Sequence, residues 1–245
     1  MLTAELFARL LLMQVGLVAA QPAGTSKSES CGSLHTIVVR ASMEYPGYGM
    51  MGALAQAVLE SVNGSTSEAI DYPALLQPYD ESSYAGIVAT TKQLQSHVDR
   101  CPDAKVILMG YSQGAHIIGD VMCGGGGKFG LTVDPNNDIP IPSLGPPTPP
   151  VAAKYQKSVV AMIQMGDPRF LPKKSYDVGT ATHEGFFPRP ANISCDAFAP
   201  IIQSYCDEGD VYCDQGDVYG VHTSYVGQYG DAALDFIKSR LQKIE

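Results

Sequence analysis

Short apolar runs alternate with helical patterns along this chain, and this alternation limits its possible folds more than any other feature. The β-branched run LHTIVVRA at 34–41 predicts a buried strand, and a helical segment at 50–62 follows it. Two further strand–helix pairs follow in the same order, at 67–73 with 83–100 and at 104–110 with 113–124. Strands that alternate with helices build a parallel sheet covered on both faces. We therefore predict a single three-layer α/β domain with a central parallel sheet flanked by helices.

The second half of the chain has fewer regular patterns. Residues 124–150 are rich in glycine and proline, which predicts a long surface loop without regular elements. The run KSVVAMIQMGD at 157–167 predicts the last clear buried strand, and an amphipathic helix at 231–244 closes the chain. For the helix at 83–100, Ser82 or Ser83 is the predicted cap.

The first twenty residues have the pattern of a secretory signal peptide. Residues 10–18 are almost all apolar, and Ala19 and Ala20 are small residues at a plausible cleavage point. This run is shorter than the roughly 20 residues that a membrane span needs; a buried N-terminal helix is the alternative. We predict a signal peptide at 1–20, a short flexible lead-in at 21–30 and the folded domain at 31–245, in a protein that is secreted to the extracellular space.

Cysteine number and sequons agree with export. An even count of six in an exported chain suggests three disulfides, among Cys31, Cys101, Cys123, Cys195, Cys206 and Cys213. Spacing leaves about fifteen pairings open, and only Cys206 and Cys213 are close enough to look like a local loop closure. No C-x-x-C or H-x-x-x-H spacing supports a zinc site, so we expect no metal. Asn63 and Asn192 begin N-x-S sequons and are candidate glycosylation sites.

The charge balance restricts the class of partner. The 245 residues are 45% hydrophobic and carry a formal net charge of −9. An apolar content of this size supports a folded core, and an acidic surface argues against nucleic acid and anionic membranes as partners. Neutral substrates such as polysaccharides, esters or lipids remain open.

The stretch VILMGYSQGAHIIGD at 106–120 places Ser112 between a predicted strand and a predicted helix. This is the context that a nucleophile elbow requires, and Gly110 and Gly114 provide the small neighbours that a strained turn needs. The turn would lift the hydroxyl above the sheet edge, where the helix N-terminus favours developing negative charge. We interpret Ser112 as a candidate nucleophile; a simple polar residue in a strand-to-helix connection is the alternative.

A serine nucleophile needs a histidine base oriented by a carboxylate. Where a nucleophile elbow follows a strand, the acid and the histidine come after the serine in that order, which leaves His183 and His222. His222 lies in a Gly/Tyr-rich loop before the closing helix, downstream of Asp207, Glu208 and Asp210 in CDEGDVYC. A disulfide across that loop would hold a carboxylate rigidly, so the sequence favours His222.

The rival base is His183, with Asp167 or Asp177 as its acid. His116 lies one helical turn beyond Ser112 and does not fit the expected order, so we do not expect it to be the base.

Several motifs in order resemble the cutinase-like serine esterases, and most closely the acetylxylan esterases of carbohydrate esterase family 5. They are VILMGYSQGAHIIGDVMCGGG, MGDPRF, SYDVG, SYCDEGDVYC and HTSYVGQYG. The resemblance runs from about Cys31 to the C-terminus, and it implies an α/β-hydrolase-type, cutinase-like fold. It also implies disulfides that join Cys31 to Cys101, Cys123 to Cys195 and Cys206 to Cys213.

The resemblance further implies the site. The nucleophile falls on Ser112, the acid on Asp210 in the C-x-x-x-D-x-x-C loop, and the base on His222. The oxyanion hole falls on the amide of Gln113 and on Ser42, the hydroxyl residue after the first strand.

The expected activity is a secreted serine esterase that removes acetyl groups from xylan or a related plant polysaccharide, as a monomer without a cofactor. A cutinase or short-chain lipid esterase with the same triad is the alternative. A secreted binding protein that keeps the fold without turnover is a third hypothesis, against which the complete triad argues.

Overall fold

A six-stranded parallel sheet forms the centre of the computed structural model, which describes residues 31–133 and 140–243. The strand order is β2-β1-β3-β6-β8-β7, and every pairing is parallel. The strands are β1 Leu34–Val39, β2 Thr66–Ala69, β3 Lys105–Tyr111, β6 Val159–Met165, β7 Asp177–Val178 and β8 Ile202–Tyr205. The predicted parallel α/β fold is therefore confirmed. The predicted leader at 1–20 and lead-in at 21–30 lie outside the described residues.

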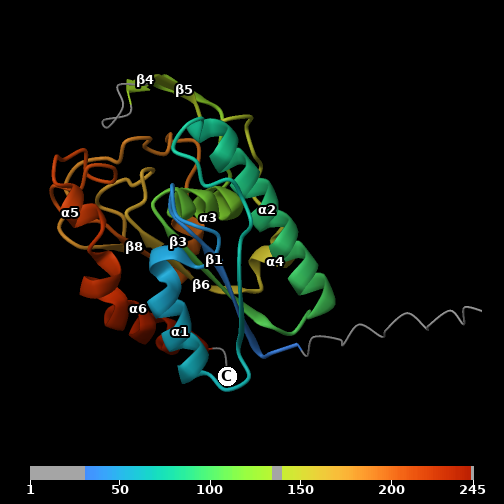
Figure 1. The fold of residues 1–245 in the computed structure, drawn as a ribbon. Coiled ribbons are helices and arrows are strands. Elements are labelled where there is room, and N and C mark those ends of the chain that lie inside the picture. The colour runs from blue at the N-terminus through green and yellow to red at the C-terminus, as the bar shows by residue number, and fades with distance from the viewer. Residues whose placement is uncertain (1–30, 134–139, 244–245) are drawn as a thin grey trace, which may run out of the picture. The chain divides into compact units, whose positions relative to one another are not determined.

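Helices cover both faces of this sheet (Figure 1). On one face lie α1 (Gly52–Ser61) and α6 (Tyr225–Gln242), which contact each other. On the other face lie α2 (Tyr79–Arg100), α3 (Gln113–Cys123) and α4 (Ala153–Gln156). The shorter helical elements are η1 Gly49–Met51, η2 Asp196–Ile201 and α5 Tyr219–His222.

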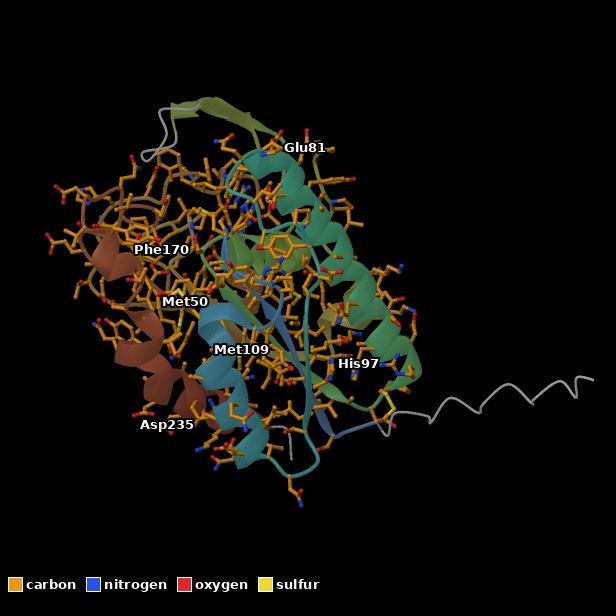
Figure 2. The ribbon with its side chains drawn as sticks, viewed as in Figure 1. Met50, Glu81, His97, Met109, Phe170 and Asp235 are labelled. Atoms are coloured by element: carbon orange, nitrogen blue, oxygen red, sulfur yellow. A yellow bond between two sulfur atoms is a disulfide. The ribbon has the colours of Figure 1, made fainter. Side chains whose placement is uncertain are left out.

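A hydrophobic core lies on each face of the sheet, and alternate residues of the strands contribute to one core or the other. Val38 and Met109 pack with α1 and α6, whereas Ile37 and Leu108 pack with α2 and α3, because successive side chains of a strand point to opposite faces. Figure 2 shows Met109 inside the structure and Asp235 of α6 at its outer surface. Within the described ranges, no helix is both long and apolar enough to span a bilayer.

The strand order reverses at β1, and this reversal places the site. From β1 the chain runs through α1 to β2 on one side, then returns through α2 to β3 on the other side. In such sheets ligands bind beyond the carboxyl ends of the strands, at the point where the order reverses. Ser42 follows β1 and Ser112 follows β3, so the two segments meet at this point.

Two expectations about the second half of the chain are wrong. The stretch 124–150 is not free of regular elements: β4 (Lys128–Val133) and β5 (Pro140–Ser143) pair as an antiparallel hairpin. Proline is tolerated there because each strand of a two-stranded sheet has a free edge. Nor is 157–167 the last strand of the sheet, because β8 and β7 extend it beyond β6. These strands have four and two residues, too few for a periodic signal.

Two helices begin earlier than predicted. Helix α2 starts at Tyr79 after Pro78, and Ser82 does not cap it but accepts a hydrogen bond from the Leu75 amide. Helix α6 starts at Tyr225, and His222 ends the short helix α5 instead of lying in a loop. Glycines within 216–231 interrupt the helical sequence pattern, so the sequence did not predict α5 or the first turns of α6.

Three disulfides join Cys31 to Cys101, Cys123 to Cys195 and Cys206 to Cys213. The first ties the chain before β1 to the end of α2, and the second ties the end of α3 to the start of η2. The third closes a seven-residue separation directly after β8. Asn63 and Asn192 are both exposed, and their glycosylation stays a prediction.

Candidate active site

Ser112 occupies a strained turn between β3 and α3. Its φ of 52° is in the region that non-glycine residues rarely adopt, while its amide donates to the Met165 carbonyl at 2.8 Å. The two flanking glycines are required by close packing. A Cβ on Gly110 would lie 2.3 Å from the Gly114 carbonyl oxygen, and one on Gly114 would lie 2.0 Å from the Val39 carbonyl oxygen. The local sequence therefore folds into the nucleophile-elbow geometry.

His222 and Asp210 form a buried hydrogen-bonded pair. The Nδ1 atom of His222 lies 2.9 Å from Oδ2 and 3.0 Å from Oδ1 of Asp210. Oδ1 also accepts the amides of Tyr212 at 2.7 Å and Cys213 at 3.0 Å, and Oδ2 accepts the hydroxyl of Tyr225 at 2.6 Å.

Burial alone would raise the pKa of the Asp210 carboxyl, but the contacts with His222 and Tyr225 outweigh it and lower that pKa. Asp210 is therefore an ionised carboxylate that holds the imidazole with a proton on Nδ1. The Cys206–Cys213 disulfide brackets this residue and closes the loop that carries it.

Three residues that support this pair escaped the sequence analysis. Tyr225 donates to Asp210, as noted, and Tyr111 donates its hydroxyl to the His222 carbonyl at 2.6 Å. A Cβ on Gly166, which follows β6, would lie 2.7 Å from Cε1 of His222. The H-x-x-Y spacing of the resemblance could have found Tyr225; the other two depend on strands that meet only in the folded chain.

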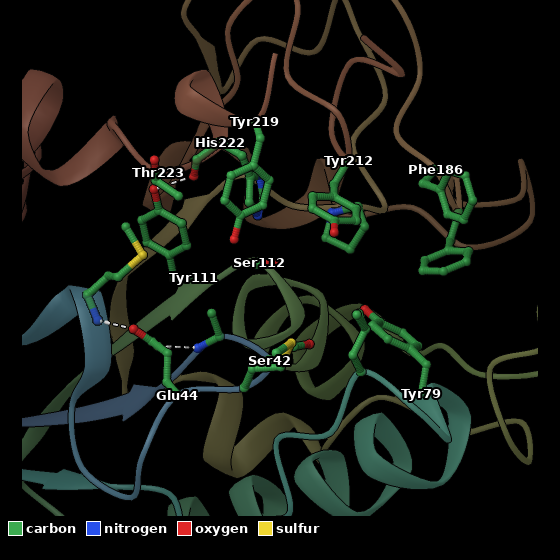
Figure 3. Close-up of a pocket in the computed structure, with 16 residues that line it drawn as sticks. Ser42, Glu44, Tyr79, Tyr111, Ser112, Phe186, Tyr212, Tyr219, His222 and Thr223 are labelled. Atoms are coloured by element: carbon green, nitrogen blue, oxygen red, sulfur yellow. Dashed lines mark hydrogen bonds between the residues drawn. The ribbon is translucent and has the colours of Figure 1, made fainter. Parts of the chain in front are cut away.

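Ser42, Ser112 and His222 line one pocket of about 270 Å³ (Figure 3). Ser112 lies at its centre, with His222 and Tyr212 on one side and Ser42 on the other. Six aromatic side chains contribute to the wall: Tyr79, Tyr111, Phe186, Phe187, Tyr212 and Tyr219. The arrangement combines a nucleophile candidate, a base candidate and a mostly apolar binding space, as ligand pockets commonly do.

Glu44 holds the loop that carries Ser42. Its carboxylate accepts the amide of Ala41 at 2.6 Å and that of Met50 at 2.7 Å, so it bridges both ends of the loop (Figure 3). Arg40 donates from Nε to the Glu44 carbonyl at 3.0 Å. The loop is therefore fixed by two charged side chains, and no sequence motif indicated the role of Glu44.

Gln113 begins helix α3 and is fully buried. Its side-chain oxygen accepts the Ser82 hydroxyl at 2.9 Å, and its Nε2 donates to the Leu75 carbonyl at 3.0 Å. Because the side chain is used in these contacts, only the backbone amide can serve a ligand at Ser112, which agrees with the role implied by the resemblance.

The rival groups lie elsewhere. His183 is exposed and faces Asp214 at 3.4 Å, so it is paired with neither Asp167 nor Asp177. Asp207, one of the three acids considered for His222, instead accepts the hydroxyl of Tyr229 at 2.8 Å. Glu208 is exposed. Asp210 is the carboxylate of that loop in hydrogen-bond contact with His222.

Among the residues that the structure describes, one group of metal-binding residue types comes together outside this site. The ligand atoms of His35, Glu68 and His97 lie within 4.8 Å of one another, although β1, β2 and α2 supply them from distant parts of the sequence. The two imidazole rings are stacked with 3.7 Å between centroids and 9° between planes. Lone pairs lie in the ring planes, so stacked rings do not aim at a common ion. The group therefore packs β1 and β2 against α2.

Comparison with known proteins places this geometry in a family. The sequence profile of the cutinase family matches residues 30–241. Cutinase 11 of Verticillium dahliae is 38% identical over 95% of this chain and 76% of its own length. Acetylxylan esterase 2 of Talaromyces purpureogenus is 36% identical over 94% of this chain and 96% of its own. The catalytic core of the acetyl xylan esterase from Trichoderma reesei superposes with a TM-score of 0.74 at 37% identity, covering 86% of this chain and 99% of that one.

Proposed function

Because this chain belongs to the cutinase family and is a carboxylic ester hydrolase, we propose that Ser112, His222 and Asp210 are its catalytic triad. The observation that carries this proposal is the buried Asp210–His222 pair, whose histidine lines the same pocket as the strained Ser112. Asp210 holds the proton on Nδ1, so Nε2 of His222 has a free lone pair for the serine proton.

In the proposed reaction, Oγ of Ser112 attacks the ester carbonyl carbon while Nε2 of His222 takes the hydroxyl proton. The tetrahedral intermediate then collapses, the C–O bond to the alcohol breaks, and the imidazolium returns the proton to the leaving alcohol. Water attacks the acyl-enzyme with the same proton transfers and releases the free acid. Asp210 stays ionised throughout and stabilises the imidazolium.

Negative charge on the carbonyl oxygen needs donors that are in place before the reaction. We assign these to the amide of Gln113, at the N-terminus of α3, and to the hydroxyl of Ser42. The bracing of the Ser42 loop by Glu44 supports this role, because a donor contributes most when its position does not change during the reaction.

The proposed substrate is a short-chain ester on a plant polysaccharide, with acetylated xylan as the first candidate. Two observations support it: relatives named for acetylxylan hydrolysis match nearly the whole chain, and the pocket of about 270 Å³ lies at the small end of ligand sites. Cutinase 11 matches equally well, so a cutinase-like activity on longer esters is the second candidate. Secretion and a cleaved leader are part of the same proposal, supported by the sequence pattern and the three disulfides.

Two experiments test these proposals. A serine-directed phosphonate should label the wild-type protein at Ser112, and His222→Ala should greatly slow that labelling; equal labelling of both would exclude the triad. Absence of any labelling would favour the binding-protein hypothesis.

For the substrate, rates on p-nitrophenyl acetate, butyrate and octanoate should fall with chain length, and acetylated xylan should be cleaved faster than a cutin-type polyester. Rates that rise with chain length would contradict the acetyl preference and support the cutinase alternative.

A further inference from the structure

Tyr79 lies in the wall of the pocket and belongs to a hydrogen-bonded chain that the proposed mechanism does not use. It is the first residue of α2, it is only 5% exposed, and it lines the same pocket as Ser112. Figure 3 shows its hydroxyl end turned toward the middle of the pocket, on the side of Ser42. The phenol oxygen lies 3.0 Å from Nδ1 of His116, a fully buried residue of α3.

The end of this hydrogen-bonded chain that lies away from the pocket determines which of its atoms carry protons. Nε2 of His116 lies 3.0 Å from Oδ2 of Asp120, which is also fully buried. Arg189 donates to the other oxygen of Asp120 at 2.7 Å, and Arg169 lies 3.3 Å from Oδ2. Burial would raise the pKa of Asp120, but the hydrogen bond with His116 and the charges of these two arginines outweigh it and lower that pKa. Asp120 is therefore a carboxylate, so Nε2 of His116 must carry a proton and donate it.

His116 itself is neutral, because burial without solvent lowers its pKa and two arginines already balance the nearby carboxylates. A neutral imidazole that donates from Nε2 has only a lone pair on Nδ1. Tyr79 must then donate its hydroxyl proton to Nδ1. Burial also raises the pKa of the Tyr79 phenol well above its usual value, so the phenol keeps that proton. Its oxygen has no proton left for the pocket and can only accept.

We propose that Tyr79 is a specificity residue that accepts a hydrogen bond from a free hydroxyl on the alcohol part of the ester. This inference rests on the proposed esterase function of Ser112 and names its substrate class more closely: esters of polyols such as partly acetylated sugars. A Tyr79 oxygen that can only accept a hydrogen bond distinguishes substrates with a free hydroxyl from those without one, because an analogue without an O–H proton leaves this oxygen unpaired.

The neighbourhood of Tyr79 suits one face of a sugar ring. Its ring centroid lies 5.0 Å from that of Phe187, which in turn lies 4.9 Å from that of Phe186. Leu76 completes this apolar end of the pocket. A sugar combines an apolar C–H face with a rim of hydroxyl donors, so it can pack on these side chains and donate to Tyr79 at once.

The test compares two substrates on three enzymes. The substrates are a methyl xyloside with one acetyl group and a free neighbouring hydroxyl, and its analogue in which fluorine replaces that hydroxyl. Fluorine keeps an electronegative atom but carries no proton. The enzymes are wild type, Tyr79→Phe and Tyr84→Phe, the last being a tyrosine of the same helix that does not line the pocket. The quantity measured is the ratio of kcat/KM for the hydroxyl substrate to that for the fluoro substrate.

We expect a ratio of about ten in wild type and in Tyr84→Phe, the range that one net hydrogen bond supplies, and a ratio near one in Tyr79→Phe. A wild-type ratio near one overturns the inference, and this result does not depend on any variant folding. A ratio of ten that survives in Tyr79→Phe assigns the recognition to another residue and overturns it equally. Absence of hydrolysis of either xyloside and of p-nitrophenyl acetate by wild type would instead contradict the proposed function.

Discussion

The substitution Asp210→Asn tests the proposed triad at the point where the structure allows the sharpest prediction. The amide oxygen of asparagine should occupy the place of Oδ1, because the backbone amides of Tyr212 and Cys213 require an acceptor there. The amide nitrogen then takes the place of Oδ2 and faces Nδ1 of His222, 2.9 Å away in the native protein. That nitrogen can only donate, so Nδ1 must become the acceptor and the ring proton moves to Nε2. A protonated Nε2 cannot take the proton of Ser112.

The size of the effect follows from this reversed tautomer. Serine hydrolases whose histidine is held in the wrong tautomer lose about 10⁴-fold in turnover, or about 5 kcal/mol of transition-state stabilisation. Asp210 lies beneath His222 and does not line the pocket, so KM should change only a few-fold. The hydroxyl of Tyr225 keeps the hydrogen bond that it accepts from the Asp207 amide at 3.0 Å. Its own proton can turn to the Cys213 sulfur, 3.3 Å away, a weak acceptor that limits the loss of stability.

The assay is steady-state hydrolysis of p-nitrophenyl acetate, with thermal unfolding to verify that each variant is folded. Asp217→Asn is the matched control, because Asp217 is an exposed carboxylate close to the same loop and should keep kcat within about twofold. A folded Asp210→Asn protein whose kcat falls less than tenfold would refute the assignment of the acid and the tautomer reasoning together.

Three further predictions follow from individual contacts. Glu44→Gln places an amide nitrogen against one of the two backbone amides whose hydrogen bonds Glu44 accepts, so the Ser42 loop should shift and kcat should fall about tenfold to a hundredfold. The control Glu60→Gln changes an exposed residue and should leave kcat unchanged. Equal kcat values for the two variants would exclude the bracing role of Glu44. Removal of the Cys206–Cys213 disulfide by paired serine substitutions should lower the free energy of unfolding by about 2.5 kcal/mol in a denaturant titration. It should also reduce kcat more than removal of the Cys31–Cys101 disulfide does. A larger loss of kcat on removal of Cys31–Cys101 would show that the loop carrying Asp210 does not need the disulfide that closes it. Burial, His35 and Arg100 lower the pKa of His97 to about 4, below its unfolded value, while Glu68 opposes them, so the folded state loses stability as the pH falls from about 6.5 toward 4. His97→Phe keeps an aromatic ring stacked on His35. Relative to wild type, it should raise the free energy of unfolding by about 1 to 2 kcal/mol more at pH 4.5 than at pH 7.5. A change in the free energy of unfolding that is the same at both pH values would contradict a buried neutral His97.

The parts of the fold that were predictable are those with a local cause. The run VILMGY carries enough apolar residues to mark a strand, and Gly-Tyr-Ser-Gln-Gly carries the steric requirement of the turn within five residues. By contrast, β8 reads IQSY and β7 has two residues, so neither carries a periodic signal. Strand β8 forms because its backbone pairs with β6, and β7 forms because its backbone pairs with β8. The hairpin β4–β5 was missed for a similar reason: its pairing is a contact between two segments, and proline and glycine obscured it.

The candidate site divides in the same way. The order of serine, acid and histidine narrowed the base to His183 or His222, and the resemblance supplied Asp210 and Ser42. The geometry then separated the alternatives, because His183 faces Asp214 and Asp207 faces Tyr229, both of which are tertiary contacts. Glu44, Tyr111 and Tyr79 carried no motif, since each acts through a partner that lies far away in the chain or that only the loop conformation brings near.

The sequence by itself determined the layered α/β class and the elbow at Ser112, because strand runs, helical periodicity and small residues at a turn act over a few neighbouring residues. The type of chemistry came from the resemblance of its ordered motifs to the cutinase-like esterases. Only the tertiary structure decided which residue braces the Ser42 loop and which atom accepts the hydrogen bond of the Tyr79 hydroxyl, and it brought Asp210, which the resemblance had implied, into contact with His222. Those outcomes depend on hydrogen bonds between segments that meet at the carboxyl edge of the sheet. Burial there makes each donor and acceptor take one partner, and no local pattern specifies which partner folding will bring.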